Sequence, residues 1–285
     1  MTSIRVFVAG TSGQIGSSIQ NKLSKIPTLE IKKDCRLNVL VIAAGTSNSR
    51  LTERDMFSEL ERFQSFVDKC EFSKYSRVVL ISSGGSVYGE DSSQVIYEET
   101  LENPATPYGR LKLECENLVE HYSNQYDFQL LVTRFANVYS SKLSGILGAL
   151  LKSSESDSEF RILSRIDSVK QYGHVDDYSE VLLNLVSSCE FWLRAPKVYC
   201  LNVFSPLSYS IGDLITIIEN ATDRKVKYDT KFQSHLRRNS IVLGTRDKIL
   251  QDIISNFPWR SVGDFLRDEI EMNPRTPYLR REDYR

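Results

Sequence analysis

The chain has 285 residues and a formal net charge of −1, with 36 Lys and Arg against 37 Asp and Glu. At roughly 150 residues per domain, this length predicts one large domain or two small ones. The balanced charge argues against general attraction to nucleic acid or to an anionic membrane. No apolar run approaches the ~18 residues of a membrane span, and the N-terminal residues lack the basic and apolar regions of a secretory signal. We therefore expect a cytoplasmic protein with no nucleic-acid or membrane partner.

The cysteines and histidines argue against a metal centre. The five cysteines are dispersed, odd in number and never arranged as C-x-x-C, and the chain has only three histidines. Such spacing predicts reduced, mostly buried thiols rather than a zinc site or a disulfide framework. The cysteines are Cys35, Cys70, Cys115, Cys189 and Cys200.

Short apolar runs alternate with helical patterns through the first half of the chain. The run at 38–44 is continuously apolar, as expected for a parallel strand that is buried on both faces. The β-α-β rhythm predicts an α/β fold, in which a Rossmann-like, doubly wound parallel sheet carries helices on both faces. We predict strands at 4–9, 38–44, 77–82 and 128–134, a further short strand at 29–32, and helices at 15–25, 52–70 and 108–122.

The second half is less regular and predicts a smaller C-terminal substrate-binding domain. Residues 140–172 are rich in Ser and charged residues, and we expect a loop and a helix over a site there. No linker separates the two halves, so we expect interleaved domains. These are a dinucleotide-binding domain at 1–139 with parts of 172–205, and a substrate-binding domain at 140–171 and 206–285, with helical patterns at 176–188, 211–221 and 265–272 and a polar tail at 273–285.

Gly10, Gly13 and Gly16 follow the first predicted strand directly and open the first predicted helix. Glycine lets the backbone turn tightly and approach a pyrophosphate, whose negative charge the helix N-terminus stabilises. The spacing is G-x-x-G-x-x-G rather than the G-x-G-x-x-G of the more general pattern, and a simple strand–helix turn would also explain it. Its position after the first strand favours a nucleotide cofactor.

Tyr108 and Lys112 lie four residues apart at the start of a predicted helix. This spacing places the phenol and the ammonium on one face. A nearby ammonium lowers the pKa of a phenol, which makes Tyr108 a usable proton donor or acceptor near neutral pH. The S-S-G-G-S-V-Y-G run at 82–89 ends a buried strand, at the sheet edge where such folds bind ligands. A surface Tyr–Lys pair and a Gly/Ser turn would explain the two motifs taken singly.

Taken together and in this order, the three motifs resemble the short-chain dehydrogenase/reductase superfamily, in its extended branch that acts on nucleotide sugars. The resemblance extends from about residue 4 to residue 270. Further segments that are similar to that branch are R-F-A-N-V-Y at 134–139, Y-G-H-V-D-D at 172–177, L-N-V-F at 201–204, Y-S-I-G-D-L at 209–214, L-G-T-R-D-K at 243–248 and P-W-R at 258–260.

The resemblance implies roles for individual residues. Tyr108 would exchange the proton at the sugar hydroxyl or carbonyl, and Lys112 would hold the nicotinamide ribose. His174 and Asp176 would brace a turn. The implied cofactor contacts are Gly10, Ser12, Gly13, Gln14, Ile15, Gly16, Lys32, Lys33, Ala43, Ala44, Tyr108 and Lys112. The implied substrate contacts are Ser83, Gly84, Gly85, Tyr108, Asn137 and, just before a predicted strand at 241–244, Arg237 and Arg238 as the diphosphate-binding arginine.

The sequence departs from the family pattern at the catalytic hydroxyl. Gly84 stands where the family places a catalytic Ser or Thr, and either Ser83 or Ser86 would supply the hydroxyl instead. In addition, the pair at 170–171 is Lys-Gln, where the family has Arg-Asp. The catalytic set implied for this chain is therefore Tyr108, Lys112, Ser83 and Ser86.

The segment between Gly16 and the strand at 38–44 is short for this family. It leaves room for little more than one short strand, which ends in Lys32 and Lys33. An acidic residue usually ends this strand in NAD users, whereas a basic pair would accept a 2′-phosphate. This favours NADP(H), although Asp34 keeps NAD(H) open.

Gln14 and the abbreviated segment resemble the dTDP-4-dehydrorhamnose reductase type within the branch. The prediction is an NADPH-dependent reductase of a nucleotide-activated 4-keto-6-deoxy sugar, in the supply of deoxysugars for surface polysaccharide or a natural product. The alternatives are an NAD-dependent nucleotide-sugar 4-epimerase and a non-catalytic dinucleotide-sensing protein. The helices at 52–70 and 108–122 resemble those that pair in the family's dimers, which implies a homodimer.

Overall fold

The main sheet has five strands, and the first strand of the chain lies at one edge of it. The structure is a computed structural model that describes residues 3–25, 36–48, 50–89, 95–142, 145–156, 159–229 and 240–272. Neighbouring strands pair in parallel throughout, which confirms the predicted α/β fold with a Rossmann-like parallel sheet. The strand order is β1 (Ser3–Ala9), β2 (Arg36–Ile42), β3 (Arg77–Ser83), β4 (Gln129–Phe135) and β7 (Val198–Val203).

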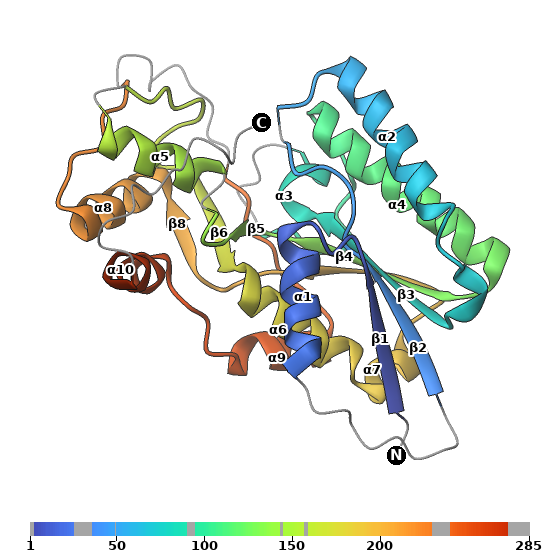
Figure 1. The fold of residues 1–285 in the computed structure, drawn as a ribbon. Helices are drawn as coiled ribbons and strands as arrows, with labels where there is room; N and C mark the ends of the chain where they lie inside the picture. Colours follow the sequence, from blue (N-terminus) through green and yellow to red (C-terminus); the bar gives the residue numbers. More distant parts are fainter. Residues whose placement is uncertain are drawn as a thin grey trace.

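Helices cover both faces of this sheet (Figure 1). The central strands are therefore buried on both sides, and in β3 the five residues at 78–82 are all buried. Two apolar cores result, one on each face of the sheet. The helices are α1 (Gln14–Lys25), α6 (Val175–Val186), α7 (Cys189–Arg194) and α9 (Lys248–Asn256) on one face, and α2 (Glu53–Val67) and α4 (Pro107–Tyr126) on the other.

Local sequence sets where α2 and α4 begin. Thr52 caps α2 through a capping box with Asp55. Thr106 caps α4 by accepting a hydrogen bond from the backbone of Gly109, at 3.1 Å. Pro107 is the first residue of α4, where no intrahelical donor is needed. The start at Pro107 places Tyr108 in the first turn of the helix.

A second, three-stranded sheet lies at the other end of the molecule with the remaining helices (Figure 1). Its middle strand, β6, pairs in parallel with β5 and antiparallel with β8, and a third apolar core holds these elements together. We keep the predicted division into interleaved domains as a proposal. The elements are β5 (Asn137–Tyr139), β6 (Val169–His174), β8 (Ser208–Ser210), α5 (Gly145–Glu155), α8 (Ile211–Thr222) and α10 (Val262–Met272).

The structure differs from the sequence prediction in several short elements. Gly84–Val87 forms a short helix, α3, in place of the predicted turn. Helices α7 and α9 are missing from the prediction, because six and nine residues are too few for a clear helical period. The strand predicted at 241–244 pairs only through single bridges, at Ile241 and Leu243. The strand predicted at 29–32 and the tail at 273–285 lie outside the described residues.

The outer edge of β1 is open in the part of the chain that the structure describes. Ten residues connect the end of α1 at Lys25 to the start of β2 at Arg36, and they lie outside the described residues. Phe7 on β1 is 42% exposed. Beside it lies a hollow of about 430 Å³, lined by Val6, Phe7, Val8, Ala9, Gln20, Leu40, Lys69, Cys70, Glu71 and Tyr75.

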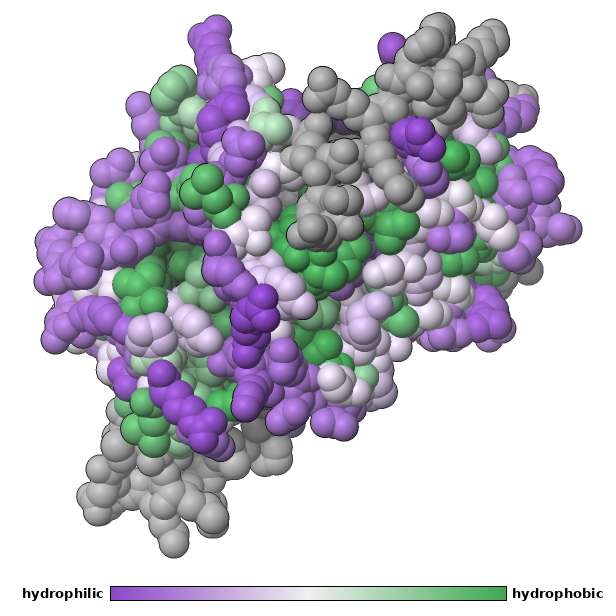
Figure 2. All heavy atoms as spheres, turned by 180° about the vertical axis from the view of Figure 1, so that it is seen from behind, coloured by the Kyte–Doolittle hydropathy of each residue, from purple (hydrophilic) through white to green (hydrophobic). Residues whose placement is uncertain are grey.

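The surface carries mixed polarity. Seen from behind, hydrophilic residues are spread over the visible face, with smaller hydrophobic areas between them (Figure 2). Among the described helices, none has both the length and the apolar character that a bilayer crossing requires.

Candidate active site

The glycine loop between β1 and α1 contains two glycines that the fold itself requires. Gly10 has a φ of +90°, and a Cβ on it would lie 2.5 Å from the carbonyl oxygen of Ala43. A Cβ on Gly16 would overlap the carbonyl oxygen of Gly10. Gly13 differs, because a Cβ there would meet nothing closer than 3.6 Å. The loop thus packs tightly against β2 and leaves Gly13 exposed at the N-terminus of α1, a geometry that suits a pyrophosphate.

Substitution should separate these two kinds of glycine. Gly16→Ala forces an overlap in a packed turn, and we expect it to lower the free energy of unfolding by about 2 kcal/mol or more. Gly13→Ala should change that free energy by less than about 1 kcal/mol. Urea unfolding of the two variants, followed by circular dichroism, measures both. Equal stabilities would show that the tight contact at Gly16 is not needed by the fold.

Tyr108 and Lys112 lie together on α4 at the carboxyl end of the main sheet. The Lys112 ammonium is 5.6 Å from the centroid of the Tyr108 ring. Lys112 is buried, and its ammonium also lies beside Gly45 in the loop after β2, at 3.6 Å from a Cβ built there. Neither the phenol nor the ammonium makes a hydrogen bond to another described residue, so both remain available to a ligand.

Gly84, at the position of the family's catalytic hydroxyl, has no space for a side chain in this structure. Gly84 is buried at the start of α3, and a Cβ on it would lie 2.5 Å from Leu243 Cδ1 and 3.1 Å from the carbonyl oxygen of Arg134. The side chain of Gln171 holds Leu243 there, because it accepts from the Leu243 backbone N–H at 2.8 Å and donates to its carbonyl at 3.1 Å. Gly84 and Gln171, which both differ from the family pattern, therefore both contact Leu243.

Ser83 and Ser86 flank this position in the chain, and each is half-buried. The Ser83 hydroxyl donates to the Ser86 hydroxyl at 3.2 Å. A Cβ on Gly109 would overlap the carbonyl oxygen of Ser86, so α3 packs directly against the first turn of α4. The backbone of Ser86 therefore lies next to Gly109, the residue that follows Tyr108.

Asn137 lies across from this cluster, next to Gly85. Its amide nitrogen donates to the carbonyl of Gln171 at 2.9 Å, and its Oδ1 is 4.0 Å from a Cβ built on Gly85. Gln14 in the glycine loop accepts a hydrogen bond from Ser140 at 2.9 Å, so the loop is linked to the chain just beyond β5. Ser12 is exposed in the loop, whereas Ile15, Ala43 and Ala44 are half-buried.

Some of the predicted residues lie outside the described part of the chain. These are Lys32, Lys33, Arg237 and Arg238. The prediction also left out Gly45, which has a φ of +99° beside the Lys112 ammonium. In the sequence, Gly45 is marked by its position directly after Ala43 and Ala44, which end the predicted strand at 38–44.

A buried ion pair behind the site is a further feature that the sequence analysis left out. Glu116 lies one turn after Lys112 on the same face of α4. Its carboxylate accepts from Arg134 Nη2 at 2.7 Å and from Arg134 Nε at 3.2 Å, and it also accepts from the Ser82 hydroxyl. Arg134 Nη2 donates to Glu102 as well, at 2.7 Å. The pair joins α4 to β3 and β4 and so fixes the helix that carries Tyr108 and Lys112.

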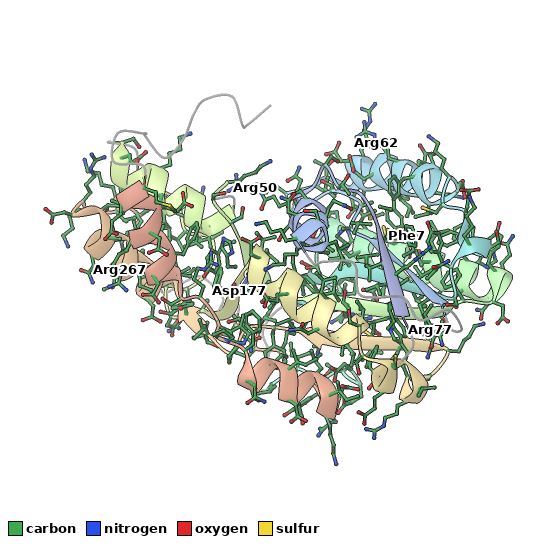
Figure 3. The ribbon with its side chains drawn as sticks, turned by 60° about the horizontal axis from the view of Figure 1, so that its bottom comes forward. Phe7, Arg50, Arg62, Arg77, Asp177 and Arg267 are labelled. Atoms are coloured by element: carbon green, nitrogen blue, oxygen red, sulfur yellow. The ribbon has the colours of Figure 1, made fainter. Side chains whose placement is uncertain are left out.

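His174 and Asp176 hold the start of α6 against α1. His174 Nδ1 accepts from the Asp176 backbone N–H at 3.2 Å, which caps the helix. Asp176 accepts from the Ser18 hydroxyl at 2.6 Å. Asp177 accepts from the Arg260 backbone N–H at 2.9 Å, at the junction between the two ends of the molecule (Figure 3). These contacts fit the turn-bracing role that the resemblance implies.

His174 should make the stability fall in mild acid. Burial and the Arg260 guanidinium lower its pKa to about 4, from 6.5, against a smaller opposing effect of Asp176. Between pH 6.5 and about pH 4, the imidazole of His174 takes up a proton in the unfolded protein but not in the folded protein. The fall in pH therefore favours unfolding. We expect the free energy of unfolding to lose about 1 kcal/mol between pH 7.5 and pH 5.5 through this group.

The control for this effect is His174→Gln, measured by urea unfolding at both pH values. The variant should lack the His174 contribution to the pH dependence, whatever its stability at pH 7.5. Asp177, whose pKa burial raises, titrates in the opposite sense, because its folded form binds the proton more tightly, so it does not imitate the effect. The same pH dependence in the variant and the original protein would contradict a neutral His174.

The comparison with known proteins was made against family models, curated proteins and solved structures. The model of the NAD dependent epimerase/dehydratase family matches residues 30–192, which is more than half of the chain. The chain belongs to this family. Membership confirms the predicted resemblance to the extended short-chain dehydrogenase/reductase branch, and with it an enzyme of the NAD(P)-dependent type.

Curated relatives match over shorter stretches. A putative UDP-glucose 4-epimerase of Methanocaldococcus jannaschii is 35% identical over 66 residues, which is 23% of this chain and 22% of that protein. UDP-arabinose 4-epimerase 1 of Arabidopsis thaliana is 33% identical over 72 residues, or 25% of this chain and 17% of that protein. The chain thus matches about a fifth of the length of these relatives.

Solved structures match over nearly the whole chain. MoeE5 in complex with UDP-glucose and NAD has a TM-score of 0.71 at 20% identity, covering 95% of this chain and 98% of that one. RMD from Pseudomonas aeruginosa, complexed with NADPH, has a TM-score of 0.70 at 18% identity, covering 94% and 98%. At these identities the likeness establishes the shared fold.

Proposed function

We propose that this family member is an oxidoreductase that acts at C4 of a nucleotide sugar, and that it reduces a 4-keto-6-deoxy sugar with NADPH. The observation that carries the proposal is the pairing of Tyr108 with Lys112 at the carboxyl end of the sheet. The Lys112 ammonium lies 5.6 Å from the centroid of the Tyr108 ring, and neither the phenol nor the ammonium makes a hydrogen bond to another described residue.

The residues around this pair fit a nicotinamide dinucleotide. The open side of Gly13, at the N-terminus of α1, would hold the pyrophosphate. Lys112, beside Gly45, would hold the nicotinamide ribose. When bound, the cofactor supplies a hydride to the sugar carbon. A preference for NADPH over NADH rests on Lys32 and Lys33 in the sequence.

The protein's own part in the reaction is to orient the sugar and to supply a proton. Tyr108 would donate its phenolic proton to the C4 oxygen as that oxygen gains negative charge. Ser86, backed by Ser83, would donate a hydrogen bond to the same oxygen. Asn137, across from Gly85, would contact the sugar nucleotide, as would Arg237 or Arg238.

A nucleotide-sugar 4-epimerase is the second candidate, because the curated relatives carry that name. The same Tyr108 and Lys112 would serve it, with a cofactor that stays bound through the cycle. Two features of the sequence support the reductase: Gln14 in the glycine loop and the short connection after α1. Both features resemble the dTDP-4-dehydrorhamnose reductase type. Deoxysugar supply is the pathway that we propose for it.

The test is a mixture of purified protein, NADPH and dTDP-4-keto-6-deoxyglucose, followed at the nicotinamide absorbance. Oxidation of NADPH that requires the sugar supports the reductase. Tightly retained NAD, with interconversion of UDP-sugars and no NADPH oxidation, supports the epimerase. If the protein shows neither activity with any nucleotide sugar, the third alternative, a non-catalytic protein that senses a dinucleotide, is supported.

We also propose a homodimer built on the outer faces of α2 and α4. Phe57 on α2 is 61% exposed, and the two helices pack side by side (Figure 1). Phe57→Glu should therefore shift the protein from dimer to monomer in sedimentation. A monomeric original protein would contradict the dimer.

A further inference from the structure

We propose that Gln171 is a positioning residue for the nucleotide sugar, and that it acts through Leu243 and Asn137 without touching the sugar. The inference deepens the proposed function and rests on it, because it concerns the sugar-binding side of the same site. In the sequence, Gln171 differs from its surroundings only in replacing the Asp of the family pattern. In the structure, it contacts the residues on both sides of the space that the sugar would occupy.

The side chain of Gln171 is buried in β6 and is used entirely by the backbone of one distant residue. Gln171 is 3% exposed. Its Oε1 accepts from the Leu243 N–H at 2.8 Å, and its Nε2 donates to the Leu243 carbonyl at 3.1 Å. A carboxamide offers an acceptor and a donor in one plane, whereas an ionised Asp offers acceptors alone. Gln171 therefore fixes the position of the chain at Leu243 through both backbone groups.

Leu243 in turn supports α3, the short helix that carries Gly85 and Ser86. The Leu243 side chain is 2% exposed, and its Cδ1 lies 2.5 Å from the position of a Cβ on Gly84. Gly84 is the first residue of α3. Protein interiors are close-packed, so a shift of Leu243 leaves a gap or an overlap at this residue. The position of α3 thus depends on the two hydrogen bonds from Gln171.

The backbone of Gln171 holds the residue on the opposite side. Asn137 Nδ2 donates to the Gln171 carbonyl at 2.9 Å, and Asn137 Oδ1 lies 4.0 Å from a Cβ built on Gly85 in α3. In Figure 1, β5 and β6 lie between the main sheet and the helices α5 and α8. A sugar that contacts both Asn137 and α3 therefore lies between two groups whose separation Gln171 sets.

The cofactor side of the site is anchored by other contacts. The glycine loop leads into α1, which Ser18 joins to Asp176 at the start of α6. Helix α4, which carries Lys112, is joined to the sheet by Glu116 and Arg134. A change at Gln171 should therefore weaken binding of the sugar nucleotide and leave the affinity for the cofactor almost unchanged.

The test is Gln171→Glu, measured by isothermal titration calorimetry with dTDP-glucose, UDP-glucose and NADP⁺ as separate ligands of the whole protein. A protonated carboxyl keeps the acceptor and the donor, whereas an ionised one turns a lone pair toward the Leu243 carbonyl. Burial and that carbonyl raise the pKa of the new carboxyl. The variant should therefore resemble the original protein in mild acid and differ from it in mild base.

At pH 8.0 we expect the variant to bind the sugar nucleotide about tenfold more weakly than the original protein does, as for one or two lost hydrogen bonds. At pH 6.0 the difference should fall to about threefold or less, because the protonated carboxyl restores both bonds. The dissociation constant of NADP⁺ should stay within about twofold at both pH values. His174 on the same strand titrates in both proteins, so the comparison at each pH removes its effect.

Gln129→Glu is the matched control. Gln129 begins β4 at the amino end of the main sheet, and its Nε2 donates to the carbonyls of Pro196 at 3.0 Å and Trp192 at 3.3 Å. The variant makes the same chemical change far from the proposed site. It should lower the free energy of unfolding and leave the dissociation constants of sugar nucleotide and NADP⁺ unchanged.

A second measurement covers the case in which Gln171→Glu unfolds at pH 8.0. Leu243→Ala removes the support of α3, and Gly84→Ala forces an overlap with Leu243. Each should weaken binding of the sugar nucleotide by about fivefold or more. In the double variant the new methyl group occupies the space that Leu243 leaves, and a small shift relieves its 3.1 Å contact with the Arg134 carbonyl. The double variant should therefore recover to within about threefold of the original protein.

Three results would overturn the inference: equal losses of sugar-nucleotide and NADP⁺ affinity in Gln171→Glu, a sugar-nucleotide affinity that does not depend on pH in that variant, or additive losses in the double variant. Failure of the proposed function is a separate result. If the original protein binds a sugar nucleotide but oxidises no NADPH with dTDP-4-keto-6-deoxyglucose, the reductase fails and the dissociation constants still decide the role of Gln171. If it binds neither dTDP-glucose nor UDP-glucose, both proposals fail.

Discussion

Tyr108→Phe should lower kcat for reduction of the sugar by about 10²- to 10⁴-fold, the usual contribution of a positioned general acid. The substitution removes only the phenolic oxygen, and this oxygen has no hydrogen-bond partner among the described residues. The ring can therefore stay beside Lys112, and the affinity for NADPH should change little. Steady-state kinetics with a 4-keto sugar nucleotide, together with a cofactor titration, measures the two effects separately.

Tyr126→Phe is the matched control. Tyr126 is on the same helix, 42% exposed, at its far end, about 27 Å along the axis from Tyr108. This variant should keep the activity of the original protein. A Tyr108→Phe enzyme that retains more than a tenth of the activity would assign the proton to another group, and Ser86→Ala would then be the next variant to measure.

Arg134→Met should cost about 3–5 kcal/mol of the free energy of unfolding. The side chains of Arg134 and Glu116 are only 4% and 7% exposed, and removing one partner of a buried pair leaves the other charge without compensation. Equilibrium unfolding in urea measures the loss. The double variant Arg134→Met/Glu116→Gln removes both charges and should recover at least half of it, since an uncharged pair needs no counter-charge.

The control for this prediction is a surface pair of the same chemistry. Arg62 extends from α2 into solvent (Figure 3) and pairs with Glu59 one turn away at 2.6 Å. Arg62→Met should change the free energy of unfolding by less than about 1 kcal/mol. If Arg134→Met were as mild as Arg62→Met, the buried pair would have no part in holding α4 against the sheet.

Local patterns predict the parts of this fold that local physics decides. The apolar runs of β1 to β4 give strands within two residues of their predicted bounds. In β3 the run is continuously apolar because a parallel strand that is buried on both faces has no polar alternation. Pro107 and the Thr106 cap fix the start of α4, and so the pairing of Tyr108 with Lys112 follows from spacing alone.

The parts that the sequence does not predict depend on contacts between distant residues. Leu243 closes the space beside Gly84 from 159 positions further along the chain, and no periodicity encodes such a contact. The same holds for Arg134 and Glu116, whose residue types alone cannot indicate whether they meet in the core or face solvent. The replacement of the family hydroxyl is visible in the sequence as Gly84, but its cause is visible only in the packing.

The contact between α1 and α6 sets a limit on how the chain can be divided. Ser18 and Asp176 lie 158 positions apart, and their hydrogen bond joins α1, which follows the glycine loop, to the start of α6. A fragment ending at Tyr139 would keep the loop, Tyr108 and Lys112. It would lose β7 from the sheet and the cover that α6, α7 and α9 give to one face. That fragment would expose an apolar surface and aggregate, so expression of the cofactor-binding half alone requires α6, α7, β7 and α9 to be grafted back onto it.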